Sequence, residues 1–98
     1  MVRRRKPPSI DCTLGGREWR IEFVTRRRLP KHCGACYWDK RLILVRYDQP
    51  QIDILDTLLH ECHHALTPMH FYAEKWITQT STELADVLDR LGVRWPDN

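Results

Sequence analysis

Residues 53–66 read DILDTLLHECHHAL, and this stretch predicts a helix that carries a metal site. It contains the pattern HExxH, in which His60 and His64 stand four residues apart. Residues four apart share one face of an α-helix, so the two imidazoles lie side by side, as two ligands of one Zn²⁺ must. Glu61 then lies where it can act as general base on a metal-bound water.

A surface helix that is merely rich in histidine is the alternative, and the apolar residues of the same stretch argue against it. At about 100° per residue, Cys62 lies at the centre of an apolar stripe, about 160° from His60 and His64. The other members of the stripe are Leu55, Leu58, Leu59, Ala65 and Leu66. One side of the helix can therefore pack on a core while the opposite side binds the metal. His63 should form a hydrogen bond at the rim of the site or stay exposed.

Two histidines rarely hold a catalytic zinc alone, so a third ligand should lie beyond this helix. Residues 68–91 predict a second helix with an apolar stripe centred near Ser81. The stripe consists of Ile77, Leu84, Ala85, Leu88 and Leu91. Glu74 lies about 20° from its centre, whereas Glu83 lies about 160° away and faces water. Because a carboxylate on a buried face needs a partner, we expect Glu74 to be the third ligand.

His70 is the alternative third ligand. The segment that begins with the first histidine of the motif and ends at His70 reads HECHHALTPMH, which has the HExxHxxxxxH spacing typical of metzincins. Metzincins have glycine at the position of Thr67, where the backbone turns sharply. Thr67 is β-branched and precedes Pro68, so it is poorly suited to that turn, and Glu74 is favoured. His70 or Tyr72 could also stabilise an oxyanion, although either residue can equally serve packing.

The 98 residues, of which 42% are hydrophobic, are enough for one small domain. We expect residues 1–8, which end in Pro7-Pro8, to be a flexible basic arm, and residues 9–98 to form a single domain. No apolar run approaches the ~20 residues needed to cross a bilayer. The basic N-terminus also lacks the apolar core of a secretory signal. These features predict a cytoplasmic protein.

Turn signals and alternating apolar residues predict an α+β fold. Gly15-Gly16 is typical of a two-residue hairpin turn, and the composition of residues 26–40 is typical of a loop. Pro50 suits the first turn of the metal-binding helix, Thr67-Pro68 interrupts it, and Gly92 ends the second helix. We therefore expect a small three-stranded sheet, covered on one side by two helices. The expected strands are 9–14, 17–25 and 41–47, and the expected helices are 50–66 and 68–91.

The four cysteines of a cytoplasmic chain should be thiols rather than disulfides. They are Cys12, Cys33, Cys36 and Cys62. Cys33 and Cys36 have CxxC spacing, but no second such pair completes a four-ligand zinc site. We expect this pair to form a turn with two thiols.

Two runs of basic residues are candidates for weak contact with nucleic acid. They are Arg3, Arg4, Arg5 with Lys6, and Arg26, Arg27, Arg28. Such runs can neutralise phosphates, but more often they are solvated tails or loops. The net charge of only +3 limits the expected attraction.

From residue 41 to residue 95 the chain resembles zincin-like metallopeptidases, and more specifically the short HExxH proteins encoded by phages and bacteria. The resemblance rests on LDTLLHECHHAL and on an acidic-started helix that ends LADVLDRLGVRW. It implies zinc-dependent hydrolysis of peptide bonds, in the host cytoplasm if a phage encodes the chain. It also implies that strand 41–47 is an edge strand that pairs with an extended peptide. The residues that match the ligands and base of the gluzincin type are His60, His64, Glu74 and Glu61.

Two other functions stay open on the sequence. The chain could bind zinc without cleaving peptides, as a regulatory or structural protein of the same fold. Alternatively, the basic runs could recruit a protease to DNA, as in the DNA-linked zincin-like proteases that the chain distantly resembles.

Overall fold

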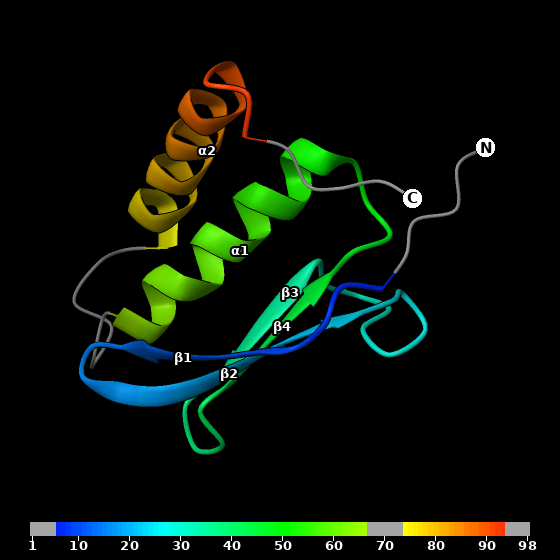
Figure 1. The fold of residues 1–98 in the computed structure, drawn as a ribbon, viewed down its shortest axis with the longest axis vertical. Helices are drawn as coiled ribbons and strands as arrows, with labels where there is room; N and C mark the ends of the chain where they lie inside the picture. The colour runs from blue at the N-terminus through cyan, green and yellow to red at the C-terminus, as the bar shows by residue number, and fades with distance from the viewer. Residues whose placement is uncertain (1–5, 67–73, 94–98) are drawn as a thin grey trace.

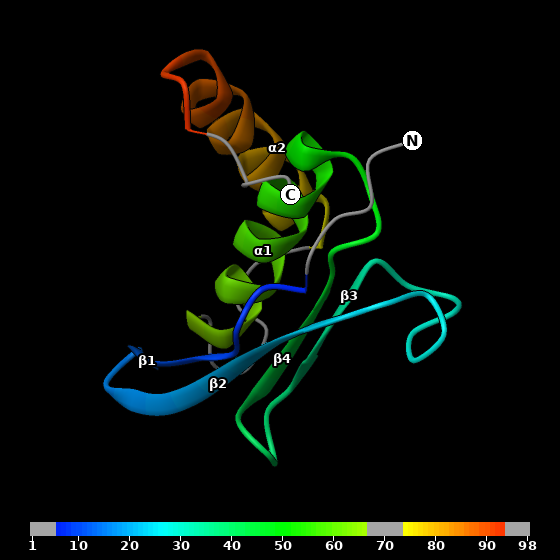
Figure 2. The same ribbon diagram turned by 45° about the vertical axis from the view of Figure 1, so that its right-hand side comes forward.

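The computed structural model describes residues 6–66 and 74–93, which form a four-stranded sheet followed by two helices. Helix α1 lies across one face of the sheet, and α2 packs on the far side of α1 (Figures 1 and 2). The predicted α+β class is confirmed, whereas the prediction of three strands is wrong. The elements are β1 (Ile10–Leu14), β2 (Arg17–Val24), β3 (Gly34–Tyr37), β4 (Leu42–Arg46), α1 (Gln51–Leu66) and α2 (Glu74–Arg90).

The additional strand is β3, which lies in the segment that we expected to be a loop. It has four residues, starts with a glycine and shows no alternation of apolar and polar residues, so its sequence carries no strand signal. Its pairing with β4 is antiparallel, from Gly34 opposite Val45 to Tyr37 opposite Leu42. Local sequence patterns do not predict a strand that forms because it pairs with another segment of the chain.

The strand order is β1-β2-β4-β3, and this order corrects a second prediction. We expected residues 41–47 to form an edge strand, but β4 lies between β2 and β3. It pairs in parallel with β2 and antiparallel with β3. Strands β1 and β3 are therefore the two edge strands, and β3 is the one that lies against Glu61 of α1.

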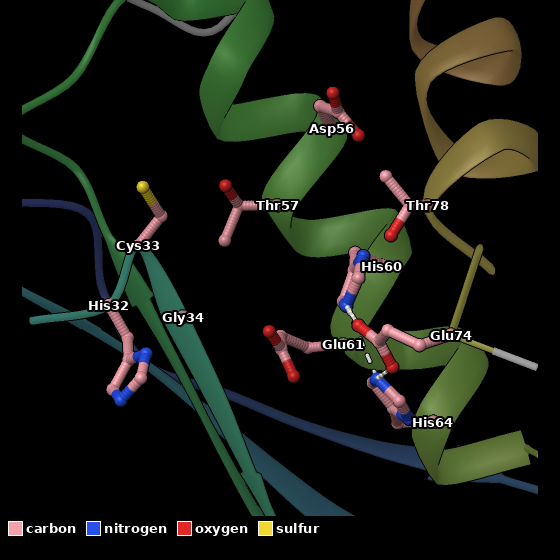
Figure 3. A pocket seen from close by; sticks show the side chains of 10 residues that line it. All are labelled: His32, Cys33, Gly34, Asp56, Thr57, His60, Glu61, His64, Glu74 and Thr78. Carbon is pink, nitrogen blue, oxygen red and sulfur yellow. Dashed lines mark hydrogen bonds and ion pairs between the residues drawn. The ribbon is translucent and has the colours of Figure 1, made fainter.

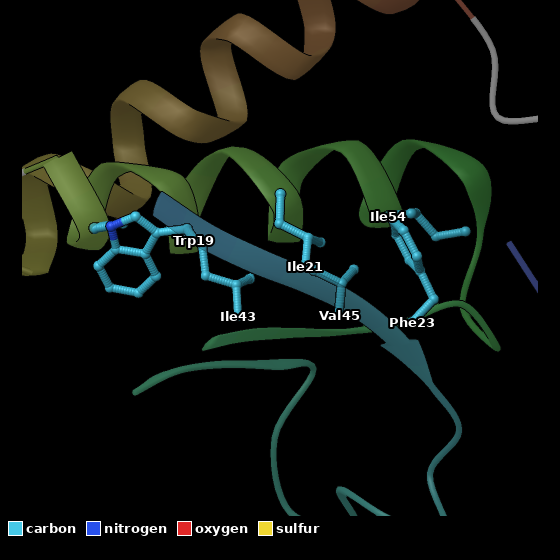
Figure 4. Packing of buried hydrophobic residues seen from close by; sticks show 7 residues of the cluster. Trp19, Ile21, Phe23, Ile43, Val45 and Ile54 are labelled. Atoms are coloured by element: carbon cyan, nitrogen blue, oxygen red, sulfur yellow. The ribbon is translucent and has the colours of Figure 1, made fainter. Parts of the chain in front are cut away.

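The β1–β2 hairpin confirms the signal at Gly15-Gly16. Both glycines have positive φ, 59° and 77°, as a two-residue turn of type I′ requires. The alternation in β2 then turns Trp19, Ile21 and Phe23 toward α1. With these residues, the core cluster between sheet and helix comprises Ile43, Val45, Ile54 and Ala65 (Figure 4).

Helix α2 packs against α1 and against no other described helix or strand. Its buried residues are Ile77, Ser81 and Ala85, which confirms the predicted centre of its apolar face. The predicted stripe is wider than this contact, however, because Leu84 and Leu91 are 45% and 75% exposed. Gly92, with φ of 89°, follows the helix as predicted. Within residues 6–66 and 74–93, no helix is long and apolar enough to cross a membrane.

Candidate metal centre

The side chains of His60, His64 and Glu74 meet between the two helices (Figure 3). The Nε2 atoms of the two histidines are 3.2 Å apart. The Glu74 carboxylate lies against both, with Oε1 2.6 Å from His60 Nε2 and Oε2 2.9 Å from His64 Nε2. The predicted four-residue spacing on α1 and the predicted phase of α2 therefore bring these three side chains together.

This donor set fits a zinc ion. Two imidazole nitrogens and one carboxylate oxygen are the protein ligands of one class of catalytic zinc sites. With zinc–nitrogen bonds of about 2.0–2.1 Å, two tetrahedral ligands lie about 3.3 Å apart, which is close to the distance between the two Nε2 atoms. We expected Glu74 to lie on a buried face, but its side chain is 61% exposed, because it is the first described residue of α2. One side of the group is therefore open to solvent. Three protein ligands would also leave the fourth coordination position of a tetrahedral zinc ion for water or substrate, as in catalytic sites.

Glu61 points from α1 toward β3 rather than toward α2, and it is 8% exposed (Figure 3). Burial raises the pKa of its carboxyl group to about 7, and the negative charge of Glu74 contributes to the shift. A carboxylate with a pKa near neutrality is suited to accept a proton during catalysis.

Gly34 explains how β3 can approach Glu61 so closely. A Cβ atom on this glycine would lie 2.6 Å from Thr57 Cγ2 and 3.0 Å from Glu61 Oε2. Any other residue would therefore displace the Thr57 and Glu61 side chains or move the strand. Sequence patterns gave no indication of this contact, because it depends on the pairing of β3.

Glu61 and His64 border two adjacent pockets. The larger, of about 410 Å³, contains the three candidate ligands and extends to His32 and Cys33, which precede β3. The smaller, of about 230 Å³, is lined by Cys36, Trp38, Glu61 and His64. The cleft therefore runs along the edge strand on both sides of the carboxylate.

Trp38 supports helix α1 from the sheet side, a role that the sequence did not reveal. Its indole N–H donates a hydrogen bond of 3.1 Å to the backbone carbonyl of His64. Its ring packs edge-to-face against Trp19, with centroids 5.1 Å apart, and the Arg17 guanidinium lies 5.7 Å from its centroid. Carbonyl groups in the last turn of a helix lack partners within the helix, so this bond fixes the backbone at His64, a candidate ligand.

Two hydrogen bonds connect α1 to α2 and so position Glu74. His63 Nδ1 and Ser81 Oγ are 2.9 Å apart, and the Thr82 hydroxyl donates to Asp56 at 2.9 Å. We expected His63 to form a hydrogen bond at the rim of the site or to stay exposed, and it does form a hydrogen bond, but with a buried partner. Ser81 is fully buried, so this contact lies inside the helix interface.

The cysteines are four free thiols, as predicted, but the CxxC pair is not a simple turn. Cys33 immediately precedes β3 and Cys36 lies within it. Burial raises the pKa of Cys36 to about 12, with contributions from Glu61 and Cys62. Among the described residues, no cysteine belongs to a group of three or more potential ligands that could hold a metal.

Several predicted functional residues lie outside the described residues: His70, Tyr72, Arg3, Arg4 and Arg5. Arg26, Arg27 and Arg28 are exposed in the connection between β2 and β3. Nucleic-acid contact through them stays a prediction.

Comparison with protein-family models, curated proteins and solved structures gave no match to this chain.

Proposed function

We propose that this protein is a zinc-dependent metallopeptidase. The observation that carries the proposal is the convergence of His60, His64 and Glu74 next to the buried carboxylate of Glu61. In a bound state, the two imidazoles and Glu74 hold the ion. When bound, zinc supplies Lewis acidity, which polarises a carbonyl group and lowers the pKa of water.

Glu61 supplies the acid–base chemistry in this proposal. Its carboxylate accepts a proton from the attacking water and later donates it to the leaving amine. Its burial against Gly34 limits its motion and excludes bulk water from one side of the carboxylate. The Glu61 side chain thus lies within the same cleft as the ligands without occupying a ligand position (Figure 3).

A peptide is the favoured substrate because β3 has no partner strand on its outer side among the described residues, so it offers backbone groups beside Glu61. The Arg46 N–H donates a 2.9 Å hydrogen bond to the Cys33 carbonyl, so the backbone groups of Cys33 face β4. Backbone groups alternate in direction along an antiparallel strand, so those of Gly34 and Cys36 face away from β4. An extended peptide could pair with them and lie along the cleft.

Glu61→Gln tests the proposal, because the amide keeps the shape of the side chain but cannot accept the proton. We expect zinc-loaded wild type to hydrolyse unfolded casein, and the variant to lose activity by about 100-fold or more. The variant should keep its zinc, as measured by elemental analysis. Glu83→Gln, on the exposed part of α2, is the matched control and should retain activity.

Two outcomes would contradict a hydrolytic role. Undiminished activity of Glu61→Gln would show that another group is the base. Full zinc occupancy of wild type without hydrolysis of a diverse peptide library would favour the alternative, a zinc-binding protein of regulatory or structural function.

A further inference from the structure

Helix α2 has a second apolar face that no described element covers. Leu84, Val87 and Leu91 are 45%, 52% and 75% exposed, and they follow one another at intervals of three and four residues. At about 100° per residue, these three side chains lie within a sector of about 60° of the helix circumference. The centre of this sector is about 90° around the helix axis from the face that contacts α1. Such spacing is that of the seam between two paired helices.

Two opposite charges flank this apolar face on the side away from α1. Glu83 and Arg90 are seven residues apart and therefore lie on the same flank of the helix. Both are exposed, and within residues 6–66 and 74–93 the one ion pair of Arg90 is a surface pair with Asp86, at 3.0 Å. A surface pair of this kind contributes little stability, so Arg90 is available to another partner.

The pattern of apolar residues and charges is complementary to itself when a second α2 runs antiparallel. In an antiparallel helix pair, equivalent flanks of the two helices meet. Glu83 of each copy then lies near Arg90 of the other, and Val87 packs between the leucines. In a parallel pair, the Glu83 and Arg90 flank would meet the opposite flank. On that flank Leu88 lies nearest to Glu83, and the one charged residue, Glu74, lies at the far end of the helix.

The charge on α2 argues against a membrane surface as the occupant of this face. Helices that lie on membranes are rich in Lys and Arg along their polar side. In α2 the acidic residues outnumber the basic ones. They are Glu74, Glu83, Asp86 and Asp89 against Lys75 and Arg90.

We propose that two copies of this chain associate through α2, as an antiparallel pair with Val87 near the two-fold axis. This inference goes beyond the proposed function and does not depend on it. Glu74 lies about 110° around the helix from the centre of the apolar face, so the cleft stays open in the pair. The apolar contact is small, so we expect a weak dimer whose formation depends on concentration.

Sedimentation equilibrium over a range of concentrations tests the association. Wild type should show a reversible monomer–dimer equilibrium, and Val87→Glu should raise its dissociation constant by about tenfold or more, since it places two like charges in the seam. The matched control is Ile52→Glu, a similar change at an apolar residue of α1 that is 36% exposed. It should leave the equilibrium unchanged. Wild type that stays monomeric at all concentrations would overturn the proposal.

Charge reversal tests the antiparallel arrangement. Glu83→Arg and Arg90→Glu should each weaken the dimer, because each places like charges together. An equimolar mixture of the two variants, and the double variant, should restore it. Circular dichroism of each variant checks the fold. Mixing two misfolded variants would not restore a dimer, so recovery in the mixture would show that charge repulsion caused the loss. Equal dimerisation by all variants, or binding of the monomer to anionic vesicles through this face, would contradict the proposal.

Discussion

At the scale of single residues, Trp38 provides the sharpest test of how the ligands are held. Its hydrogen bond to the His64 carbonyl is lost in Trp38→Phe, while most of the ring packing remains. We expect this variant to bind zinc about tenfold more weakly, as measured by competition with a chromogenic chelator, because supporting contacts orient metal ligands.

The matched control for Trp38→Phe is Trp19→Phe. The Trp19 indole nitrogen is buried and has no hydrogen-bond partner among the described residues, so this change removes ring area alone. It should lower stability and leave zinc affinity unchanged. If Trp38→Phe binds zinc as tightly as wild type, or if Trp38→Phe and Trp19→Phe lose zinc affinity equally, the hydrogen bond does not position His64.

The sequence predicted which side chains of the candidate site lie together, whereas their binding of zinc stays a prediction. His60 and His64 come together because of a four-residue spacing, and Glu74 because of its phase on a second helix. The roles of Gly34 and Trp38 could not be predicted, because both depend on β3, whose place in the sheet is set by pairing with β4.

At the scale of elements, Asp48 joins the β4–α1 connection to the segment that follows β2. Its carboxylate accepts hydrogen bonds from the Arg26 backbone N–H at 2.7 Å and from the Arg46 side chain at 2.9 Å. Partial burial raises the pKa of this carboxyl group, but the two hydrogen bonds and the Arg46 charge outweigh it, so the net pKa is lowered. The ionised form therefore stabilises the fold.

This coupling predicts a pH-dependent effect of Asp48→Asn. Because the pKa in the folded state lies below the ordinary value of 3.8, the stabilisation is present above pH 3.8 and is lost as the pH falls through the lowered pKa. In urea unfolding at neutral pH the variant should be less stable by about 1 kcal/mol, a value reduced by partial exposure. In acid the difference should vanish.

Asp39→Asn, at an exposed position in the β3–β4 turn, is the control for this effect. It should behave as wild type at both pH values. A difference between Asp48→Asn and wild type that is the same in acid and at neutral pH would refute the assignment to the charge.

At the scale of the whole molecule, local patterns predicted the class of fold but not the order of the strands. The hairpin at Gly15-Gly16 and both helices follow from short-range signals. The parallel pairing of β2 with β4 joins residues about twenty positions apart, and no local sequence pattern predicts such a pairing. Because of it, residues 41–47 lie inside the sheet and not at its edge. The edge strand, and with it one wall of the cleft, was therefore assigned to the wrong segment.

In the whole molecule, Glu74 is the residue on which the proposed metal centre most depends, because it is the one candidate ligand from α2. Helix α2 contacts only α1 among the described elements, and Glu74 is its first residue. A metal held by His60, His64 and Glu74 would therefore bridge the two helices, and binding would add to their association.

Zinc titration of wild type, Glu74→Ala and Glu83→Ala by calorimetry is the most direct test of the proposed centre. We predict one zinc per chain for wild type and for Glu83→Ala. Glu74→Ala should bind it more than about 100-fold more weakly, because even the supporting residues of metal ligands are worth 10- to 100-fold in affinity. Wild-type affinity in Glu74→Ala, with loss of zinc in His70→Ala, would contradict the account and assign the third ligand to His70. Failure of wild type to bind zinc would remove the metal centre altogether.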